Sequence, residues 1–160
     1  MTPNTHNPQK AAGLAGAHDP PWSQIGLHRI RVVHDTVEWI LDGPVSLTEL
    51  QQFEQFQYQV ERTFQYVLIL VDCHKAGGIS PQARRYVAEQ TKLRPDLKTF
   101  SALYGCSPMI VALSTLVVRA ITLFSGRPHP VEICRDEASA REHMAAFRQT
   151  FQRKLGETPR

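Results

Sequence analysis

Three cysteines and one of the seven histidines in this 160-residue chain are placed where they could do metal or redox chemistry together. Cys73, Cys106 and Cys134 each follow the predicted carboxyl end of a strand, and His74 adjoins the first of them. Because the ends of parallel strands lie along one edge of a sheet, these four side chains can converge there. Three thiolates and one imidazole are enough for a zinc site, but the Cys-x-x-Cys pairs that usually supply two ligands are missing. We therefore expect ordinary buried or half-buried thiols and no metal.

Catalysis by the same residues is not favoured by their spacing. Cys73 and His74 have the types of a nucleophile and a general base, but adjacent residues on a strand point to opposite faces. No other nucleophile, base and orienting residue occur in a recognisable spacing, and no two histidines stand four residues apart as zinc ligands on a helix do. The sequence therefore predicts a protein that is not an enzyme and needs no cofactor.

A second group of polar residues lies between Asp72 and Ser80, after the aliphatic run Val67–Val71. Gly77-Gly78 predicts a turn, and backbone amides in such a turn can bind a phosphate; a turn that needs positive φ is the simpler interpretation. Ser80 is expected to cap a helix. A phosphate on Ser80 would be stabilised by the helix dipole, so the residue is also a candidate switch.

The elements that must position these residues follow from hydrophobic periodicity. Alternation predicts two strands, His28–His34 and Thr36–Asp42, joined tightly and closed by Gly43-Pro44. Ser46 and Glu49 form a capping box that begins a helix. The later predicted elements are the strand Val67–Val71, a helix begun by Ser80-Pro81, the strand Thr99–Tyr104, a helix begun by Ser107-Pro108, the strand Pro130–Cys134 and a helix capped by Asp136. The order ββαβαβαβα predicts an α/β fold with four helices and a mixed, mostly parallel five-stranded sheet.

Composition divides the chain into an arm, one domain and a tail. Residues 1–26 are rich in proline and lack apolar periodicity, which predicts a disordered arm; the domain covers 27–155 and a flexible tail covers 156–160. Trp22 and Ile25 can dock on the domain. A net charge of +3 is too small to indicate a nucleic-acid partner. Three unpaired cysteines and no secretory signal lead us to expect a cytoplasmic protein.

The third predicted helix, Pro108 to Phe124, is apolar nearly all round and carries one charge, Arg119. At about 17 residues it is at or below the length needed to span a bilayer, and we expect no transmembrane segment. A helix that is apolar on all sides must be covered on all sides. Neighbouring helices, a second subunit or protein partner, and a lipid-like ligand are the three candidate covers. The residues predicted to form this surface are Leu113, Leu116, Val117, Ala120, Ile121 and Phe124.

These features together resemble the STAS domain, the anti-sigma-factor-antagonist fold, and most of all the bacterial STAS/SEC14-type small proteins. The resemblance rests on the Asp42-Gly43-Pro44-Val45-Ser46 turn and on the passage LILVDCHKAGGISPQARRYV with its Val71-Asp72 strand end. It also includes the long apolar third helix, and it covers about Leu27 to Phe147.

The resemblance implies a regulatory role for the start of the second helix. In regulatory STAS proteins a serine or threonine there is phosphorylated by a partner kinase, and Ser80 occupies the matching position. The usual Asp-Ser/Thr-Ser/Ala-Gly run is replaced here by Gly78-Ile79-Ser80-Pro81.

Three functions are therefore open at this point. The first is a non-catalytic regulatory or scaffolding module that binds a protein or a second copy of itself. The second is a carrier or sensor of an apolar, lipid-like molecule, and the third is an enzyme or metal/redox site at the sheet edge. An exposed apolar patch over Leu113, Val117 and Phe124 would favour the first. An apolar cavity of about 300 Å³ or more would favour the second.

Overall fold

The computed structural model describes residues 19–94, 97–125 and 130–156, and these form a mixed sheet with helices on both faces. The elements, in chain order, are β1 (Ser23–Ile25), β2 (His28–Val33), β3 (Thr36–Val45), α1 (Leu47–Phe64), β4 (Tyr66–Ile79), α2 (Pro81–Leu93), β5 (Lys98–Tyr104), α3 (Pro108–Ser125), β6 (Val131–Ile133) and α4 (Glu137–Gly156). The strands lie side by side in chain order. β1, β2 and β3 pair antiparallel, and β3 to β6 pair parallel. The predicted α/β fold and its four helices are confirmed.

The described sheet has six strands, one more than the sequence predicts, because β1 lies in the segment assigned to the arm. Ser23 pairs with Ile30, and Ile25 is buried in the core. Arg31 lies over the ring of Trp22, 4.4 Å from its centroid, which holds the chain against β2. Three residues are too few for alternation to be visible in a sequence. Residues 1–18 and 157–160 of the predicted arm and tail lie outside the described residues.

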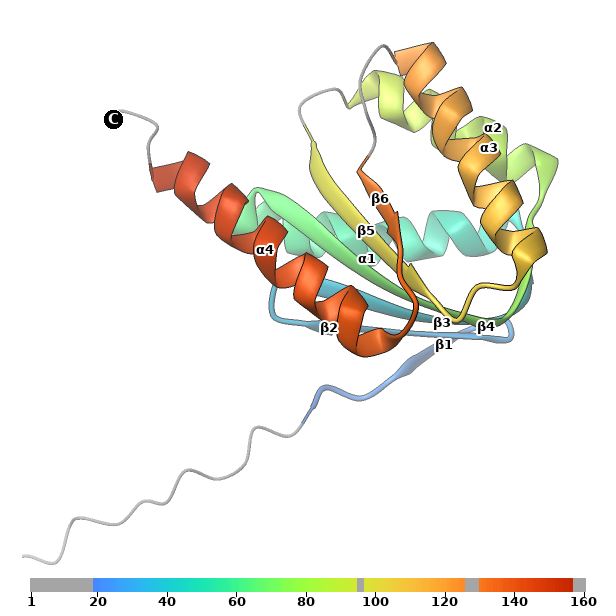
Figure 1. Cartoon of the computed structure of the whole chain (residues 1–160), viewed down its shortest axis with the longest axis horizontal. Coiled ribbons are helices and arrows are strands. Elements are labelled where there is room, and N and C mark those ends of the chain that lie inside the picture. Colours follow the sequence, from blue (N-terminus) through green and yellow to red (C-terminus); the bar gives the residue numbers. More distant parts are fainter. Residues whose placement is uncertain (1–18, 95–96, 126–129, 157–160) are drawn as a thin grey trace, which may run out of the picture.

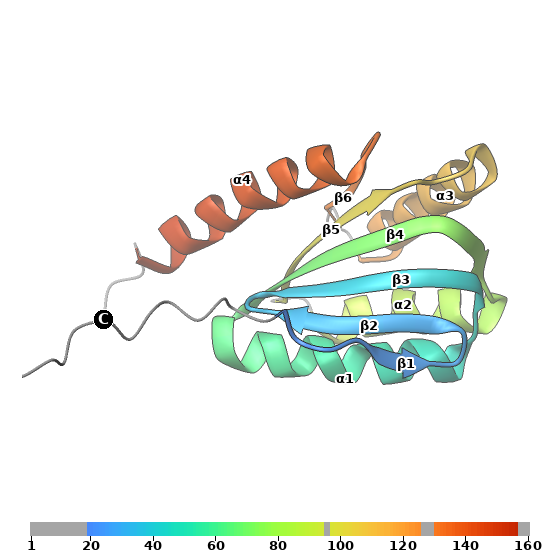
Figure 2. The ribbon, with the colours of Figure 1, turned by 90° about the horizontal axis from the view of Figure 1, so that it is seen from below.

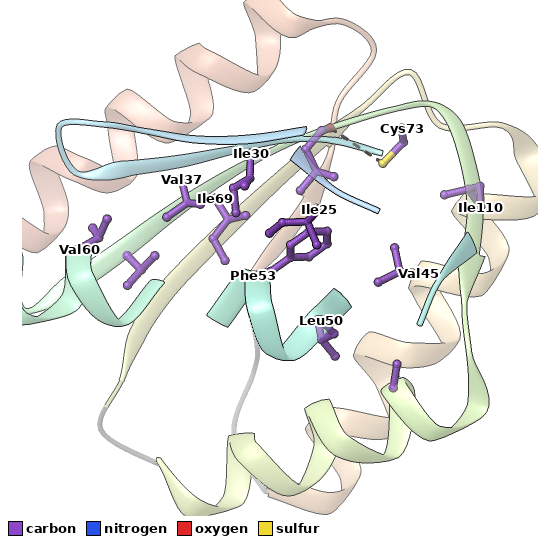
Figure 3. Packing of buried hydrophobic residues seen from close by; sticks show 13 residues of the cluster. Ile25, Ile30, Val37, Val45, Leu50, Phe53, Val60, Ile69, Cys73 and Ile110 are labelled. Carbon is purple, nitrogen blue, oxygen red and sulfur yellow. Dashed lines mark hydrogen bonds between the residues drawn. The ribbon is translucent and has the colours of Figure 1, made fainter. Parts of the chain in front are cut away.

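Helices cover the two faces of the sheet unequally. α4 packs alone on one face, where its Phe147 stacks on Phe100 of β5 with ring centroids 3.8 Å apart. α1, α2 and α3 lie on the opposite face, with Phe53 of α1 fully buried at the centre of a larger core (Figure 3). Figure 2 shows α1 and α4 on opposite sides of the twisted strands. The core that concerns function is the one beneath α1 to α3.

The predicted helix starts are confirmed at the level of individual hydrogen bonds. Glu49 accepts a bond from the Ser46 amide at 2.8 Å while the Ser46 hydroxyl accepts from the Glu49 amide at 3.3 Å, which is a complete capping box. Ser80 accepts from the Ala83 amide at 3.2 Å, so it caps α2 as expected. These caps fix where each helix leaves the sheet, and so which residues reach the face beneath α1 to α3.

β3 and β4 extend further than the sequence predicts. β3 continues through Gly43-Pro44, and β4 runs through the predicted glycine turn, because the two extensions pair with each other: Gly43 opposes Ala76 and Val45 opposes Ile79. The register shifts between these pairs, so the added length is bulged. Gly77-Gly78 therefore lies in a strand rather than in a turn. The extension carries the end of β4 toward α2 (Figure 1).

Gly77 is the residue that this close pairing requires, and its replacement by alanine is expected to destabilise the fold by about 1–3 kcal/mol. A Cβ atom at this position would lie 2.6 Å from the backbone nitrogen of Pro44, which must then move. Urea unfolding would measure the loss. Gly156→Ala is the matched control because an added Cβ meets nothing within 4 Å there. Equal stability of the two variants would contradict the close approach.

Candidate functional site

An apolar cavity of about 290 Å³, partly open to solvent, lies between the sheet and the helices α1, α2 and α3. Its floor is formed by side chains of β3, β4 and β5, and its walls by the inner faces of the three helices. Floor residues include Trp39, Leu41, Ile69, Val71, Cys73 and Leu103. Wall residues include Leu50 of α1, Val87 of α2 and Ile110, Leu113, Val117 and Ile121 of α3. Most of the lining is aliphatic, so the cavity suits an apolar occupant.

The cavity exists because α3 is supported beside the sheet rather than flat upon it. α3 packs against α2 and against β4, and no comparable packing joins it to β5 or β6 within the described residues. The support from β4 comes from its bulged end: a Cβ atom added to Gly78, whose φ is +94°, would lie 3.1 Å from Leu113. Figure 1 shows α3 running beside α2, away from β5. The bulged end of β4 therefore lies close to Leu113 on the inner side of α3.

Polar side chains gather where α1 and the end of α2 line the cavity. Glu54, Gln57, Gln90 and Arg94 are among the lining residues. The Tyr86 hydroxyl donates to Glu54 at 2.6 Å, and this bond to a carboxylate raises the pKa of Tyr86 to about 12. Arg94 pairs with Glu61 and lies over the ring of Tyr58, 4.5 Å from its centroid. This part of the lining can meet a polar group at the end of an otherwise apolar molecule.

One buried donor in the lining has no partner. The indole N–H of Trp39 is buried and forms no hydrogen bond within the described structure. Buried indole nitrogens usually find an acceptor, since leaving one unpaired costs about 1–3 kcal/mol. Alternation in β3 indicates that Trp39 faces the helices, but the sequence holds no signal for the unpaired donor.

The residues predicted to form one apolar surface on α3 divide between two faces. Leu113, Val117 and Ile121 line the cavity, and Ile121 is buried. Leu116 points to the outside and is 64% exposed, while Ala120 is half-buried. The side chain of Phe124 lies outside the described residues. An exposed patch over Leu113 and Val117 is therefore not what the structure shows.

The exposed outer face of α3 carries three large apolar side chains spaced seven residues apart. Met109, Leu116 and Leu123 are 64%, 64% and 83% exposed. Seven residues are close to two helical turns, so the three side chains follow one line along α3. No described helix is long and apolar enough to cross a membrane.

The three cysteines divide between the two faces of the sheet. Cys73 and Cys106 both belong to the core on the cavity side. The neighbouring Cys106 thiol, together with burial, raises the pKa of Cys73, and the Cys73 thiol lowers the pKa of Cys106. Figure 3 places Cys73 at the Ile110 end of the core, far from Val60. Cys134 is buried on the α4 side.

The described residues bring together no group of three or more side chains that could hold a metal ion. His74, the fourth candidate ligand, is exposed and its Nδ1 lies 2.7 Å from Asp72. Its ring packs against Tyr104 and covers Gly105, where an added Cβ would lie 2.4 Å from that nitrogen.

The other predicted site residues stay apart along β4. Asp72 accepts the His74 backbone amide at 3.0 Å as well as contacting its ring. Ser80 caps α2 at the far end of the strand, and the extended chain from Asp72 to Ile79 separates the two. The structure therefore does not bring Asp72 together with Ser80 in one site. An anion site at Gly77, Gly78 and Ser80 and a switch at Ser80 remain predictions.

A buried ion pair on the α4 side is a feature that sequence reasoning missed. Arg148 donates to both carboxylate oxygens of Asp35, at 2.6 and 2.8 Å, and the Tyr66 hydroxyl donates at 2.7 Å. Burial opposes ionisation of Asp35, but these bonds outweigh it and lower the pKa of that carboxyl. The pair fixes α4 to the β2–β3 turn and takes no part in the cavity.

Comparison with known proteins supports the fold but identifies no matching sequence family. No protein-family model matches the sequence, and no curated protein matches it. An uncharacterized protein of the DUF3478 family with a SpoIIAA-like fold, from Shewanella loihica PV-4, is similar with a TM-score of 0.50 at 14% identity, covering 79% of this chain and 98% of that chain. The anti-sigma factor antagonist SpoIIAA in its unphosphorylated form gives a TM-score of 0.47 at 12% identity, over 76% of this chain and 97% of that chain. The chain therefore has a SpoIIAA-like fold.

Proposed function

We propose that this chain is a STAS-like module that binds one apolar, acyl-chain-like molecule in the cavity between the sheet and α1 to α3, and that it carries or senses this molecule without catalysis. The observation that carries the proposal is the cavity itself, about 290 Å³ in volume and lined mostly by aliphatic side chains. This volume is near the lower end of the range for small-molecule sites, about 300 Å³.

An empty cavity of this kind would be costly to the fold. At about 24 cal/mol per Å³, a closed and empty cavity of 290 Å³ would cost at most about 7 kcal/mol. That is comparable with the whole stability of a typical domain, about 5–15 kcal/mol. Water entering from the open side lowers the cost but gains few hydrogen bonds from aliphatic walls. An apolar occupant removes the cost, which supports a ligand as the normal content.

The lining also suggests which way the occupant lies. An acyl chain would extend over Ile69, Val71 and Val117, where the walls are aliphatic. Its polar end would lie near Gln57, Gln90 and Arg94, the polar part of the lining. The unpaired indole N–H of Trp39 offers a donor to a carbonyl or carboxylate of the ligand.

The proposal predicts an affinity that rises with the length of the acyl chain. Saturated fatty acids of increasing length should displace an environment-sensitive dye from the full chain, with affinity rising by up to roughly fourfold for each added methylene. The rise should end once the chain fills the cavity. Absence of binding, or an affinity that does not depend on chain length, would contradict the proposal.

Protein binding through the outer face of α3 is a second candidate, supported by a different observation. Met109, Leu116 and Leu123 are exposed along one line of the helix, and a seven-residue spacing is the repeat with which two helices pack together. A second copy of the chain would cover this line by packing α3 against α3.

Sedimentation over a range of concentrations tests this second candidate. Self-association through α3 predicts a dimer that Leu116→Glu shifts to monomer, while a glutamate at an exposed residue of α4, Gln149→Glu, leaves the dimer intact. A wild-type chain that stays monomeric at every concentration would contradict it.

A further inference from the structure

Cys73 lies on β4, and Cys106 lies in the loop between the end of the neighbouring strand β5 and the start of α3. β4 and β5 pair in register up to Asp72 and Tyr104, and the two cysteines follow one and two residues later. Neighbouring strands lie about 4.8 Å apart, and a disulfide needs Cα atoms about 4.4–6.8 Å apart. Both cysteines belong to the core on the cavity side of the sheet. The strand register therefore places them beside each other at the carboxyl ends of β4 and β5.

We propose that Cys73 and Cys106 form a reversible disulfide when the protein meets a peroxide, and that this bond ties the start of α3 to the cavity floor. The proposal stands on the adjacency of the two thiols and does not require a ligand in the cavity.

The two cysteines differ in the way that such a reaction needs. Cys106 is half-buried, so an oxidant can reach it, whereas Cys73 is buried. The neighbouring Cys73 thiol lowers the pKa of Cys106, with a further contribution from the nearby His74, and this favours the Cys106 thiolate. Cys106 is therefore the thiol that is oxidised first, and Cys73 is the one that resolves the product.

The reaction balances with hydrogen peroxide as the oxidant. The Cys106 thiolate attacks the peroxide, the O–O bond breaks, and the sulfur becomes a sulfenic acid while hydroxide leaves. The Cys73 thiol then attacks that sulfur, forming the S–S bond and releasing water. In sum, two thiols and one peroxide give one disulfide and two waters, and a dithiol reductant reverses the change.

The bond would join two parts of the cavity. Cys73 lines the floor, and Cys106 precedes Ser107, whose hydroxyl accepts from the Ile110 amide at 3.3 Å and caps α3. The first turn of α3 contributes Ile110 to the wall of the cavity. The disulfide therefore fixes this wall to the floor at one end.

Cys134 provides an internal control, because the sheet separates it from the pair. It packs with α4 on the opposite face, and its amide donates to the Leu103 carbonyl at 2.7 Å. The native full chain should be treated with hydrogen peroxide and its intact mass measured. The protein should then be denatured and alkylated, and the alkylated cysteines located by peptide mapping. We expect an intact mass lower by about 2 Da before alkylation, and Cys134 as the single alkylated cysteine of the three.

Two variants keep the test decisive. Cys134→Ser should form the same bond, and dithiothreitol should restore both thiols. Cys73→Ser should leave Cys106 as a sulfenic acid that dimedone traps. The proposal is overturned if Cys106 remains fully alkylated after peroxide, or if the bond maps to Cys134 instead.

Discussion

Replacing Val117 by tryptophan is expected to weaken the binding of an acyl-chain probe by at least about tenfold. Val117 lines the cavity from α3, and an indole in its place occupies volume that the ligand would fill. Each ligand methylene left outside loses about 0.8 kcal/mol, so excluding two of them already accounts for about a tenfold loss. Dye displacement by a saturated fatty acid would measure the change.

The neighbouring residue is a matched control for this variant. Leu116 is on the same helix, but its side chain is 64% exposed on the outer face. Leu116→Trp adds the same ring to the outside and should leave affinity unchanged. If the Leu116 variant loses binding while Val117→Trp retains it, the ligand binds the outer face of α3 and the cavity is not the site.

Replacing Arg148 by methionine is expected to cost about 1–3 kcal/mol of stability at neutral pH, because Asp35 is buried while Arg148 is partly exposed to solvent. The change removes both hydrogen bonds from the guanidinium to Asp35. Methionine keeps a long, unbranched side chain in place of the arginine methylene groups. It leaves a buried carboxylate with only the Tyr66 and Thr36 hydroxyls as described donors. Urea unfolding, with Arg153→Met as the exposed control on α4, would measure the difference.

The same variant has an expected pH signature. In the wild type the pKa of Asp35 is lowered from its ordinary value of 3.8 in the folded state. Its ionisation therefore stabilises the fold above pH 3.8, and the stabilisation is lost as pH falls through the lower folded pKa. Without Arg148 this pKa rises, so the variant should lose less stability than the wild type as pH falls below 3.8, and the difference between the two should narrow in acid. Equal stability of Arg148→Met and Arg153→Met across the pH range would contradict the buried pair.

The fold was largely predictable because its signals are local. Ser46 with Glu49, and Ser80 before a proline, mark helix starts through residues a few positions apart, and the structure shows both caps. The continuous run Val67–Val71 marks a strand buried on both faces. The extension of β4 through Gly77-Gly78 was not predictable, because it depends on pairing with Gly43-Pro44, more than 30 residues earlier.

The candidate site was harder to predict, for two physical reasons. α3 is apolar on every side, so no periodicity distinguishes the cavity residue Val117 from the exposed Leu116. The cavity itself is lined by three strands and three helices that are distant in the sequence, an arrangement that no short segment encodes. The strand-end positions allowed all three cysteines to converge, and the structure brings only Cys73 and Cys106 to the cavity side, with Cys134 on the other face.

The central claim is that an apolar molecule occupies the space beneath α3, and methyl NMR tests it most directly. With isotope-labelled methyl groups and a saturated fatty acid, the account predicts intermolecular NOEs from the acyl chain to Ile69 and Val71 of the floor and to Val117 of the wall. It predicts none to Met109, Leu116 or Leu123, which lie on the outer face. NOEs confined to those three outer residues, or absent from every cavity methyl at saturating ligand, would contradict the account.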